Sequence, residues 1–198
     1  MHEDELNYLR EAFRKSKNYA SLWDWPDKRI KERGIVCDLL ESILRVSGRR
    51  EIKKVHSSEV DPPDCIGTAV NGGFVAFEVT ELVDQKTVEL NKTGKSVFKQ
   101  WSPDELTTKL QEKIATKDLK EFHGGPFSKV VLVIHTDEPL LSHADCEKIL
   151  RGKKFGPCKK ITDIYIIFSD VLGREFYPFI QLDMMGLFDA KQPASLAA

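Results

Sequence analysis

The stretch DPPDCIGTAVNGGFVAFEVTELV, residues 61–83, decides the fold of this 198-residue chain. Its second half reads as a strand over 74–83, in which alternation puts Glu78 and Thr80 on one face and Val79 on the other. The Asn-Gly dipeptide at 71–72 is typical of a hairpin turn, so the residues before it are expected to pair with this strand. A buried carboxylate in mid-strand is costly unless it is protonated, paired with a cation or bound to a metal. Glu78 therefore marks a candidate site.

The hairpin register predicts which acid lies near Glu78. If residues 71–73 form the turn, paired positions sum to 144, which places Asp64 opposite Thr80 and diagonal to Glu78. Facing strand residues lie about 5 Å apart and diagonal ones about 7–8 Å, so both carboxylates could bind one hard cation. A set of oxygen ligands suits Mg²⁺ or Mn²⁺. Asp64 and Glu78 are the candidate metal ligands.

The composition favours one globular domain without a strong overall field. Hydrophobic residues make up 41% of the chain, and 30 Lys+Arg against 31 Asp+Glu give a net charge of −1. Any polyanion would have to bind a local basic patch. No run reaches the roughly 20 apolar residues that cross a bilayer, so no membrane partner is expected. Four cysteines without a CxxC pair indicate reduced, structural thiols in a cytoplasmic protein: Cys37, Cys65, Cys146 and Cys158.

Helical and strand periods alternate along the rest of the chain. Helices are expected over 3–15 and 27–46, over 103–122 after the Ser102-Pro103 cap, and over 142–150. A strand region runs from Ile52 to the turn, and buried strands are expected over 129–135 and 163–168. The Lys-rich segment 84–100 shows no period and is expected to be a mobile connection.

This order predicts an α/β fold, a three-layer α/β/α sandwich with a central mixed sheet. We expect a single domain over residues 1–183 that carries an N-terminal helical extension. Residues 184–198 are expected to form a flexible C-terminal tail.

The dipeptide Pro63-Asp64, the hairpin and the tripeptide Glu78-Val79-Thr80 resemble the PD-(D/E)XK, or restriction-endonuclease-like, nuclease superfamily. The core of that family is a helix, a three-stranded meander, a helix, a strand and often a further helix. Residues 27–170 match this order, except that the third meander strand has no evident counterpart in the sequence. The resemblance implies a restriction-endonuclease-like core and hydrolysis of phosphodiester bonds with Mg²⁺ or Mn²⁺, with DNA favoured over RNA.

The resemblance also implies roles for residues outside the hairpin. An acid on the first helix often joins the site in this family, which favours Glu32, with Glu41 second. Thr80 stands where the family usually carries a lysine, and in some members that lysine lies on the following helix. Lys117 is the favoured replacement and Lys113 its neighbour. The candidate nucleic-acid contacts are Thr80, Gln111, Arg49, Arg50, Lys53 and Lys54.

Three interpretations remain open on the sequence. The first is a metal-dependent nuclease acting on DNA. The second is a catalytically inactive member of the fold that binds nucleic acid or a protein partner, which the absence of lysine at Thr80 suggests. The third is an unrelated α/β domain whose Glu78 pairs with a cation such as Lys117. His135, at a strand end, is expected to be a hydrogen-bonded structural residue, and the oligomeric state is left open, a homodimer included.

Overall fold

The computed structural model describes residues 27–93, 97–169 and 176–185. Within them, six strands form one mixed sheet in the order β1-β2-β3-β4-β5-β6. The strands are β1 Ile52–Ser57, β2 Cys65–Ala69, β3 Phe74–Glu81, β4 Lys129–Thr136, β5 Asp163–Phe168 and β6 Phe179–Gln181. The first three form an antiparallel meander, β3, β4 and β5 are parallel, and β6 pairs antiparallel with β5.

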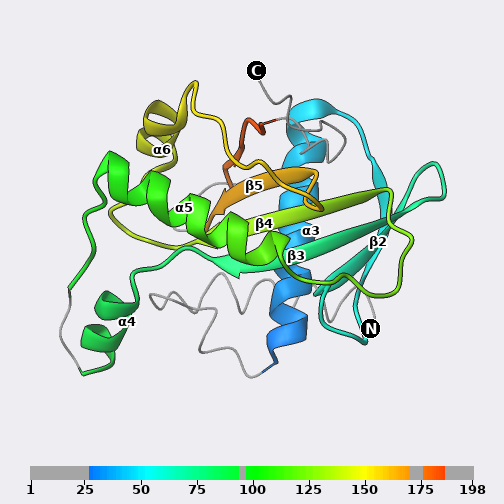
Figure 1. Ribbon diagram of the computed structural model, residues 1–198, viewed down its shortest axis with the longest axis horizontal. Helices are drawn as coiled ribbons and strands as arrows, with labels where there is room; N and C mark the ends of the chain where they lie inside the picture. Colours follow the sequence, from blue (N-terminus) through cyan, green and yellow to red (C-terminus); the bar gives the residue numbers. More distant parts are fainter. Residues whose placement is uncertain (1–26, 94–96, 170–175, 186–198) are drawn as a thin grey trace, which may run out of the picture.

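Helices cover both faces of this sheet. The described residues contain α3 Lys28–Ser47, α4 Gln85–Lys92, α5 Pro103–Asp118 and α6 His143–Leu150. In Figure 1, α3 lies behind the sheet and α5 in front of it, and each packs on its own hydrophobic cluster. The predicted α/β architecture, with helices around a mixed sheet, is confirmed. The meander strand that the sequence does not reveal is β1, because the region between Ile52 and the turn contains two strands.

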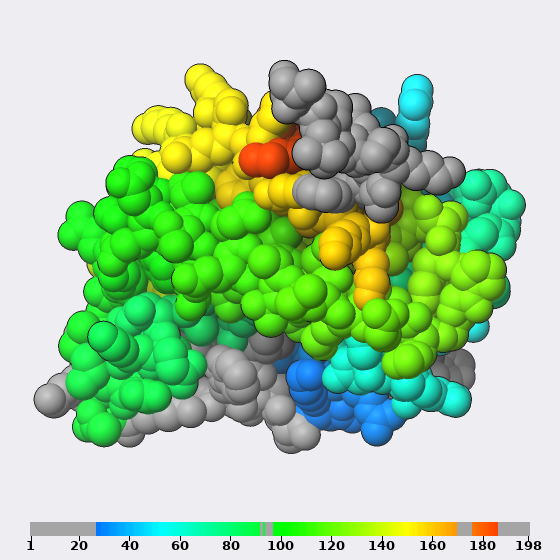
Figure 2. Space-filling view, in the orientation of Figure 1, coloured from blue at the N-terminus to red at the C-terminus, as the bar shows by residue number. Residues whose placement is uncertain are grey.

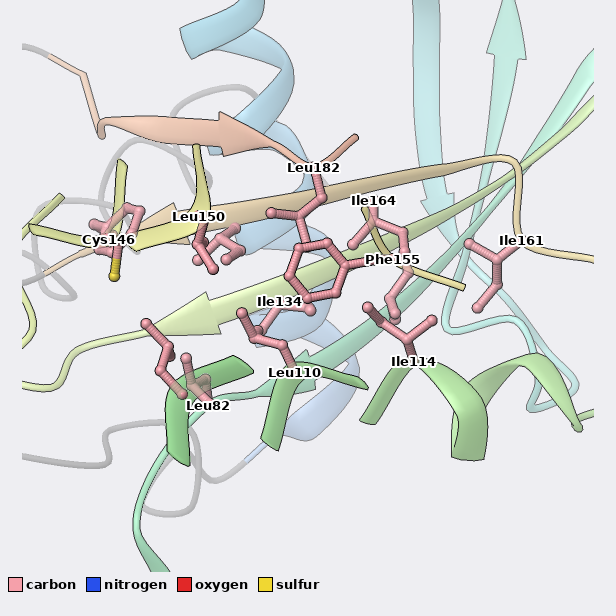
Figure 3. Packing of buried hydrophobic residues seen from close by; sticks show 14 of the residues in the cluster. Leu82, Leu110, Ile114, Ile134, Cys146, Leu150, Phe155, Ile161, Ile164 and Leu182 are labelled. Atoms are coloured by element: carbon pink, nitrogen blue, oxygen red, sulfur yellow. The ribbon is translucent and has the colours of Figure 1, made fainter. Parts of the chain in front are cut away.

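Strand alternation divides the sheet residues between two cores. Leu132 and Ile134 of β4 face α5, and Val131 and Val133 face α3. Figure 3 shows the core on the α5 side, where helix and sheet residues surround Phe155. Figure 2 shows that α5 covers much of this face of the molecule.

The segment 84–100 is not simply a connection, so that prediction is wrong for residues 85–92. They form α4, whose N-cap is Asp84. The Asp84 carboxylate accepts hydrogen bonds from the Thr87 backbone N–H at 2.9 Å and from the Thr87 hydroxyl at 2.8 Å. Val88 packs against Val83, which attaches this short helix to the end of β3.

Helix α5 ends at Asp118, four residues before the predicted end at 122. The Asp118 carboxylate accepts hydrogen bonds at 2.7–2.9 Å from three successive backbone N–H groups, those of Lys159, Lys160 and Ile161. The last turn of α5 is therefore fixed to the loop before β5.

The predicted helix over 3–15 lies outside the described residues, as do residues 186–198 of the predicted tail. At the start of that tail, the backbone N–H of Met185 donates to the Phe155 carbonyl at 2.7 Å, and Met184 forms a β-bridge with Phe155. The first two residues of the predicted tail are therefore paired with Phe155. Among the described helices, none combines the length and the apolar character needed to span a membrane.

The cysteines have the structural character that the sequence predicts. All four are free thiols, and Cys65, Cys146 and Cys158 are buried. Burial, followed by a nearby carboxylate, raises the pKa of Cys146 to about 12 and that of Cys158 to about 11. These thiols therefore fill space in the core.

Leu110→Ala tests the packing of α5 on the sheet. Leu110 is fully buried, and its truncation should lower the free energy of unfolding by about 2–5 kcal/mol through lost burial and a cavity. Leu119→Ala, at a side chain 76% exposed just beyond the same helix, should change it by less than about 0.5 kcal/mol. Urea unfolding measures both, and similar effects in the two variants would contradict this packing.

Candidate metal centre

The β2–β3 hairpin brings Asp64 and Glu78 directly opposite each other. The observed pairs, such as Cys65 with Phe77, sum to 142, so the predicted register of 144 is wrong. The turn closes one residue earlier than predicted, because the Ala69 backbone N–H donates to the Gly73 carbonyl at 2.8 Å. A shift of two positions leaves every side chain on its predicted face. Continuing the register by one residue therefore moves the partner of Asp64 from Thr80 to Glu78.

Three carboxylates gather at the start of β2. Ligand atoms of Asp61, Asp64 and Glu78 all lie within 4.8 Å of one another, a geometry that could hold a metal ion. Glu78 is fully buried, and its Oε2 atom has no hydrogen-bond partner. A buried carboxylate oxygen without a donor is expensive, and a bound cation would satisfy it. The donor set of this cluster fits a hard divalent cation.

Two lysines neutralise the other oxygen of Glu78. The Lys117 ammonium donates to Glu78 Oε1 at 2.6 Å, and the Lys120 ammonium donates to the same atom at 2.7 Å. Lys117 also donates to the Val79 carbonyl at 3.3 Å, and Lys120 lies 3.6 Å from Asp61. Burial is the largest single influence on the Lys120 amine and lowers its pKa, but the hydrogen bond to Glu78 and the charges of the nearby carboxylates together raise the pKa.

The carboxylate of Asp64 is held by the backbone of β3. Its Oδ2 atom accepts a hydrogen bond of 2.7 Å from the Val79 N–H, just past the last β2–β3 pair. Burial, and then the charge of Glu78, raises the pKa of Asp64 to about 7. When two carboxyl groups are buried close together, repulsion between their negative charges favours the protonated form of one of them. A bound cation would oppose this effect.

Helix α3 contributes Glu32, as predicted, through a lysine that the sequence reading missed. The Lys28 ammonium lies 3.1 Å from Glu32 Oε1 and 4.0 Å from Asp64 Oδ1, so it bridges the two acids. Burial raises the pKa of Glu32, although its hydrogen bond with Lys28 opposes that shift. Glu41, the second candidate, instead forms an ion pair with Arg45 on the same helix.

The lysines reach Glu78 because α5 is anchored at two points. Asp118 fixes its last turn, as described above, and the Lys160 ammonium donates to the Lys120 carbonyl at 2.7 Å. Earlier in the helix, the Gln111 side chain donates to the Gly156 carbonyl at 3.1 Å and accepts from the Gly156 N–H at 3.3 Å. Gln111 therefore holds the helix in place, whereas the sequence suggested a contact with nucleic acid.

The remaining predicted residues lie at varying distances from the acids. Thr80 is on the same face as Glu78, two residues along β3, and is half-buried. Lys113 is one turn before Lys117, and burial lowers its pKa; its nearby carboxylates are Glu81 and Glu112. The exposed basic residues lie toward the other end of the β1–β2 pair, where they border an open groove: Arg49, Arg50, Lys53 and Lys54. The structure thus brings together Glu32, Asp64, Glu78 and Lys117, but not this basic group.

His135 has the structural role that its position predicts. It is buried at the end of β4, and its Nε2 atom lies 2.8 Å from the Ser169 hydroxyl. Its Nδ1 atom lies 3.8 Å from Glu81, its neighbour in the sheet register. These contacts lie on the opposite face of the sheet from the Glu78 side chain.

Three residues of the centre escaped the sequence reading. Asp61 is the first residue of the stretch 61–83, but an acid before two prolines is typical of a turn. Lys28 precedes Glu32 by one turn of α3, a spacing that puts the two on one side of the helix. Lys120 follows Lys117 by three residues but lies beyond the end of α5 at Asp118. Helical spacing is therefore a sequence signal for Lys28 and not for Lys120.

Comparison with known protein families, curated proteins and solved structures found no match for this chain. The interpretation of the centre therefore depends on its own geometry and on the order of its elements.

Asp64→Asn should stabilise the metal-free protein at neutral pH. The pKa of Asp64 rises from 3.8 to about 7 on folding, so its stabilising contribution is complete below about pH 4 and is lost as the pH rises through about 7. Asparagine cannot ionise, and its side-chain oxygen can still accept from the Val79 N–H. The gain in free energy of unfolding should therefore grow between these two pH values and level off above them.

Urea unfolding at a series of pH values with EDTA measures this gain. Glu147→Gln, at an exposed carboxylate on α6, a helix that packs against β6 at the opposite edge of the sheet, is the matched control and should show no such trend. A difference between Asp64→Asn and wild type that is constant with pH would contradict the raised pKa.

Proposed function

We propose that this protein is a metal-dependent nuclease of the PD-(D/E)XK kind that hydrolyses phosphodiester bonds in DNA. The observation that carries the proposal is the grouping of Asp64 and Glu78 on one face of a hairpin, with the ammonium of Lys117 at 2.6 Å from Glu78. Metal-dependent hydrolysis of a phosphodiester requires carboxylates that bind the metal ion and a nearby cation that stabilises charge on the phosphate. The two acids and the adjacent lysine are groups of these kinds.

The order of elements supports a restriction-endonuclease-like core. Helix α3 is followed by the meander β1-β2-β3, then α5, β4, α6 and β5, with α4 as an addition between β3 and α5. This is the helix, three-stranded meander, helix, strand and helix order of the family that the sequence resembles. The residues that carry the resemblance take part in this core, since Asp64 lies just before β2 and Glu78 lies in β3.

Mg²⁺ or Mn²⁺ is the ion that we propose for the centre, because all of its candidate ligands are carboxylate oxygens. Asp64 and Glu78 would hold it, and Asp61 is close enough to assist. When bound, such an ion polarises the scissile phosphate and lowers the pKa of a water molecule.

The protein's own residues would supply the positioning and the remaining charge. Lys117 replaces the lysine that is missing at Thr80, and its second hydrogen bond, to the Val79 carbonyl, keeps its ammonium beside the acids. There it would stabilise negative charge that develops on the phosphate in the transition state. Glu32 acts as a positioning residue, since Lys28 connects it to Asp64.

The position of Lys117 also weighs against the alternative of a catalytically inactive binding module. That alternative was suggested by Thr80 alone, and a lysine from α5 supplies the missing charge. It predicts binding of nucleic acid without cleavage, so the activity assay below separates the two.

Glu78→Gln and Lys117→Met should each reduce metal-dependent DNA cleavage by about 10²-fold or more, because each removes charge at the reacting phosphate or its metal. Nicking of supercoiled plasmid and degradation of a labelled oligonucleotide with Mg²⁺ or Mn²⁺ measure the activity, with EDTA as the blank. Lys109→Met is the matched control on α5, where Lys109 pairs with the exposed Glu112. Full activity in Glu78→Gln would refute the proposed function.

Glu32→Gln should reduce the same activity by a smaller factor, about 10- to 100-fold, as expected of a residue that positions a ligand. Metal affinity measured by calorimetry should fall together with cleavage. An unchanged affinity and rate would remove Glu32 from the centre and leave the rest of the assignment standing.

A further inference from the structure

Two ammonium groups share one carboxylate oxygen in the metal-free centre. Lys117 and Lys120 donate to Glu78 Oε1 at 2.6 Å and 2.7 Å, although like charges repel at this separation. The attraction of both ammonium groups to the carboxylates of the cluster compensates for the repulsion between them. The two lysines thus supply positive charge that a bound divalent ion would otherwise provide.

The two lysines are not equivalent. Lys117 belongs to α5, is held by a second hydrogen bond to the Val79 carbonyl, and has a side chain 19% exposed. Lys120 lies beyond the helix end and its side chain is 34% exposed. Its second partner is Asp61, at 3.6 Å, whose side chain is 61% exposed. Lys120 is therefore the one that can move toward solvent.

Lys120 also stands between two candidate ligands. Its ammonium contacts Glu78 and lies near Asp61, and both belong to the cluster that could hold a metal. A divalent ion bound to these carboxylates would meet the charge of Lys120 at close range. Displacement of this side chain would remove that repulsion.

We propose that Lys120 is an exchangeable counter-ion of the metal centre, which leaves Glu78 for a backbone phosphate when nucleic acid binds, so that metal and nucleic acid bind cooperatively. The inference deepens the proposed function and rests on it for the identity of the phosphate-bearing ligand. A phosphodiester at the centre would be a new anionic partner for the Lys120 ammonium. The metal ion would then neutralise the carboxylates in place of Lys120. Linkage requires the effect to be reciprocal, so the ion must also tighten the binding of nucleic acid.

The first experiment measures Mn²⁺ affinity of the full chain by calorimetry without nucleic acid. Lys120→Met should bind Mn²⁺ about tenfold more tightly than wild type, because the competing ammonium is gone. Lys120→Arg keeps the charge and should bind Mn²⁺ with the affinity of wild type. Lys109→Met, on α5, is the control for the loss of a lysine away from the centre. Circular dichroism establishes that each variant is folded. Equal or weaker Mn²⁺ binding in Lys120→Met would overturn the inference.

The second experiment measures the coupling itself. Fluorescence anisotropy gives the affinity of wild type for a short DNA duplex with EDTA and with Ca²⁺, another hard cation that prefers oxygen ligands. Ca²⁺ should tighten binding at least about fivefold in wild type, and this factor should fall toward one in Lys120→Met. The same factor in both proteins would overturn the inference.

The outcomes of these experiments and of the cleavage assay are separable. Cooperative binding that depends on Lys120, in a protein that does not cleave DNA, would refute nuclease activity and uphold the counter-ion role. Cleavage by a protein whose Lys120→Met variant binds Mn²⁺ like wild type would refute the counter-ion role alone.

Discussion

The buried carboxylate of Glu78 is the constraint on which the centre depends. It lies in mid-strand beside Leu132, in a sheet whose neighbouring positions are apolar, and it is fully buried. An ionised group in such a place requires opposite charge close by. Lys117 and Lys120 provide it from one side, and the meander places Asp64 on the other. The end of α5 and the β2–β3 hairpin therefore meet at Glu78 for an electrostatic reason, and the first turn of α3 joins them through Lys28, which lies 4.0 Å from Asp64.

Residues outside the centre fix the position of α5 relative to Glu78. Asp118 attaches the last turn of α5 to three backbone N–H groups of the loop before β5, and Gln111 makes two hydrogen bonds to Gly156. These anchors set the axial position of α5 and hence the reach of Lys117. The ammonium can thus arrive from a helix instead of from position 80 of the strand. The proposed hydrolysis requires an ammonium group at a particular point in space, and more than one position along the chain can supply it.

Local signals in the sequence were sufficient for most of the elements but not for all of the centre. Alternation around Glu78 and the Asn-Gly turn predicted the hairpin and its faces, and an error of two in the register left Asp64 on the correct face. The helix α4 was missed because a single cap, Asp84, and a small apolar contact decide it. Asp61, Lys28 and Lys120 were missed for another reason. Their importance arises from tertiary proximity, and each has an ordinary surface role when it is considered within its own segment.

The state of the acids distinguishes this centre from a structural ion pair. A pair formed by Glu78 and Lys117 alone would satisfy both charges, and a second buried carboxylate would only add repulsion. Instead Asp64 lies directly opposite, with its pKa raised to about 7, and Glu78 Oε2 is buried without a donor. Both features cost stability in the metal-free chain, and neither improves packing. A divalent cation bound by these carboxylates would remove both costs at once, because it would favour the ionised form of Asp64 and supply a partner for Glu78 Oε2. These two features are what the proposal of a metal centre explains and a structural ion pair does not.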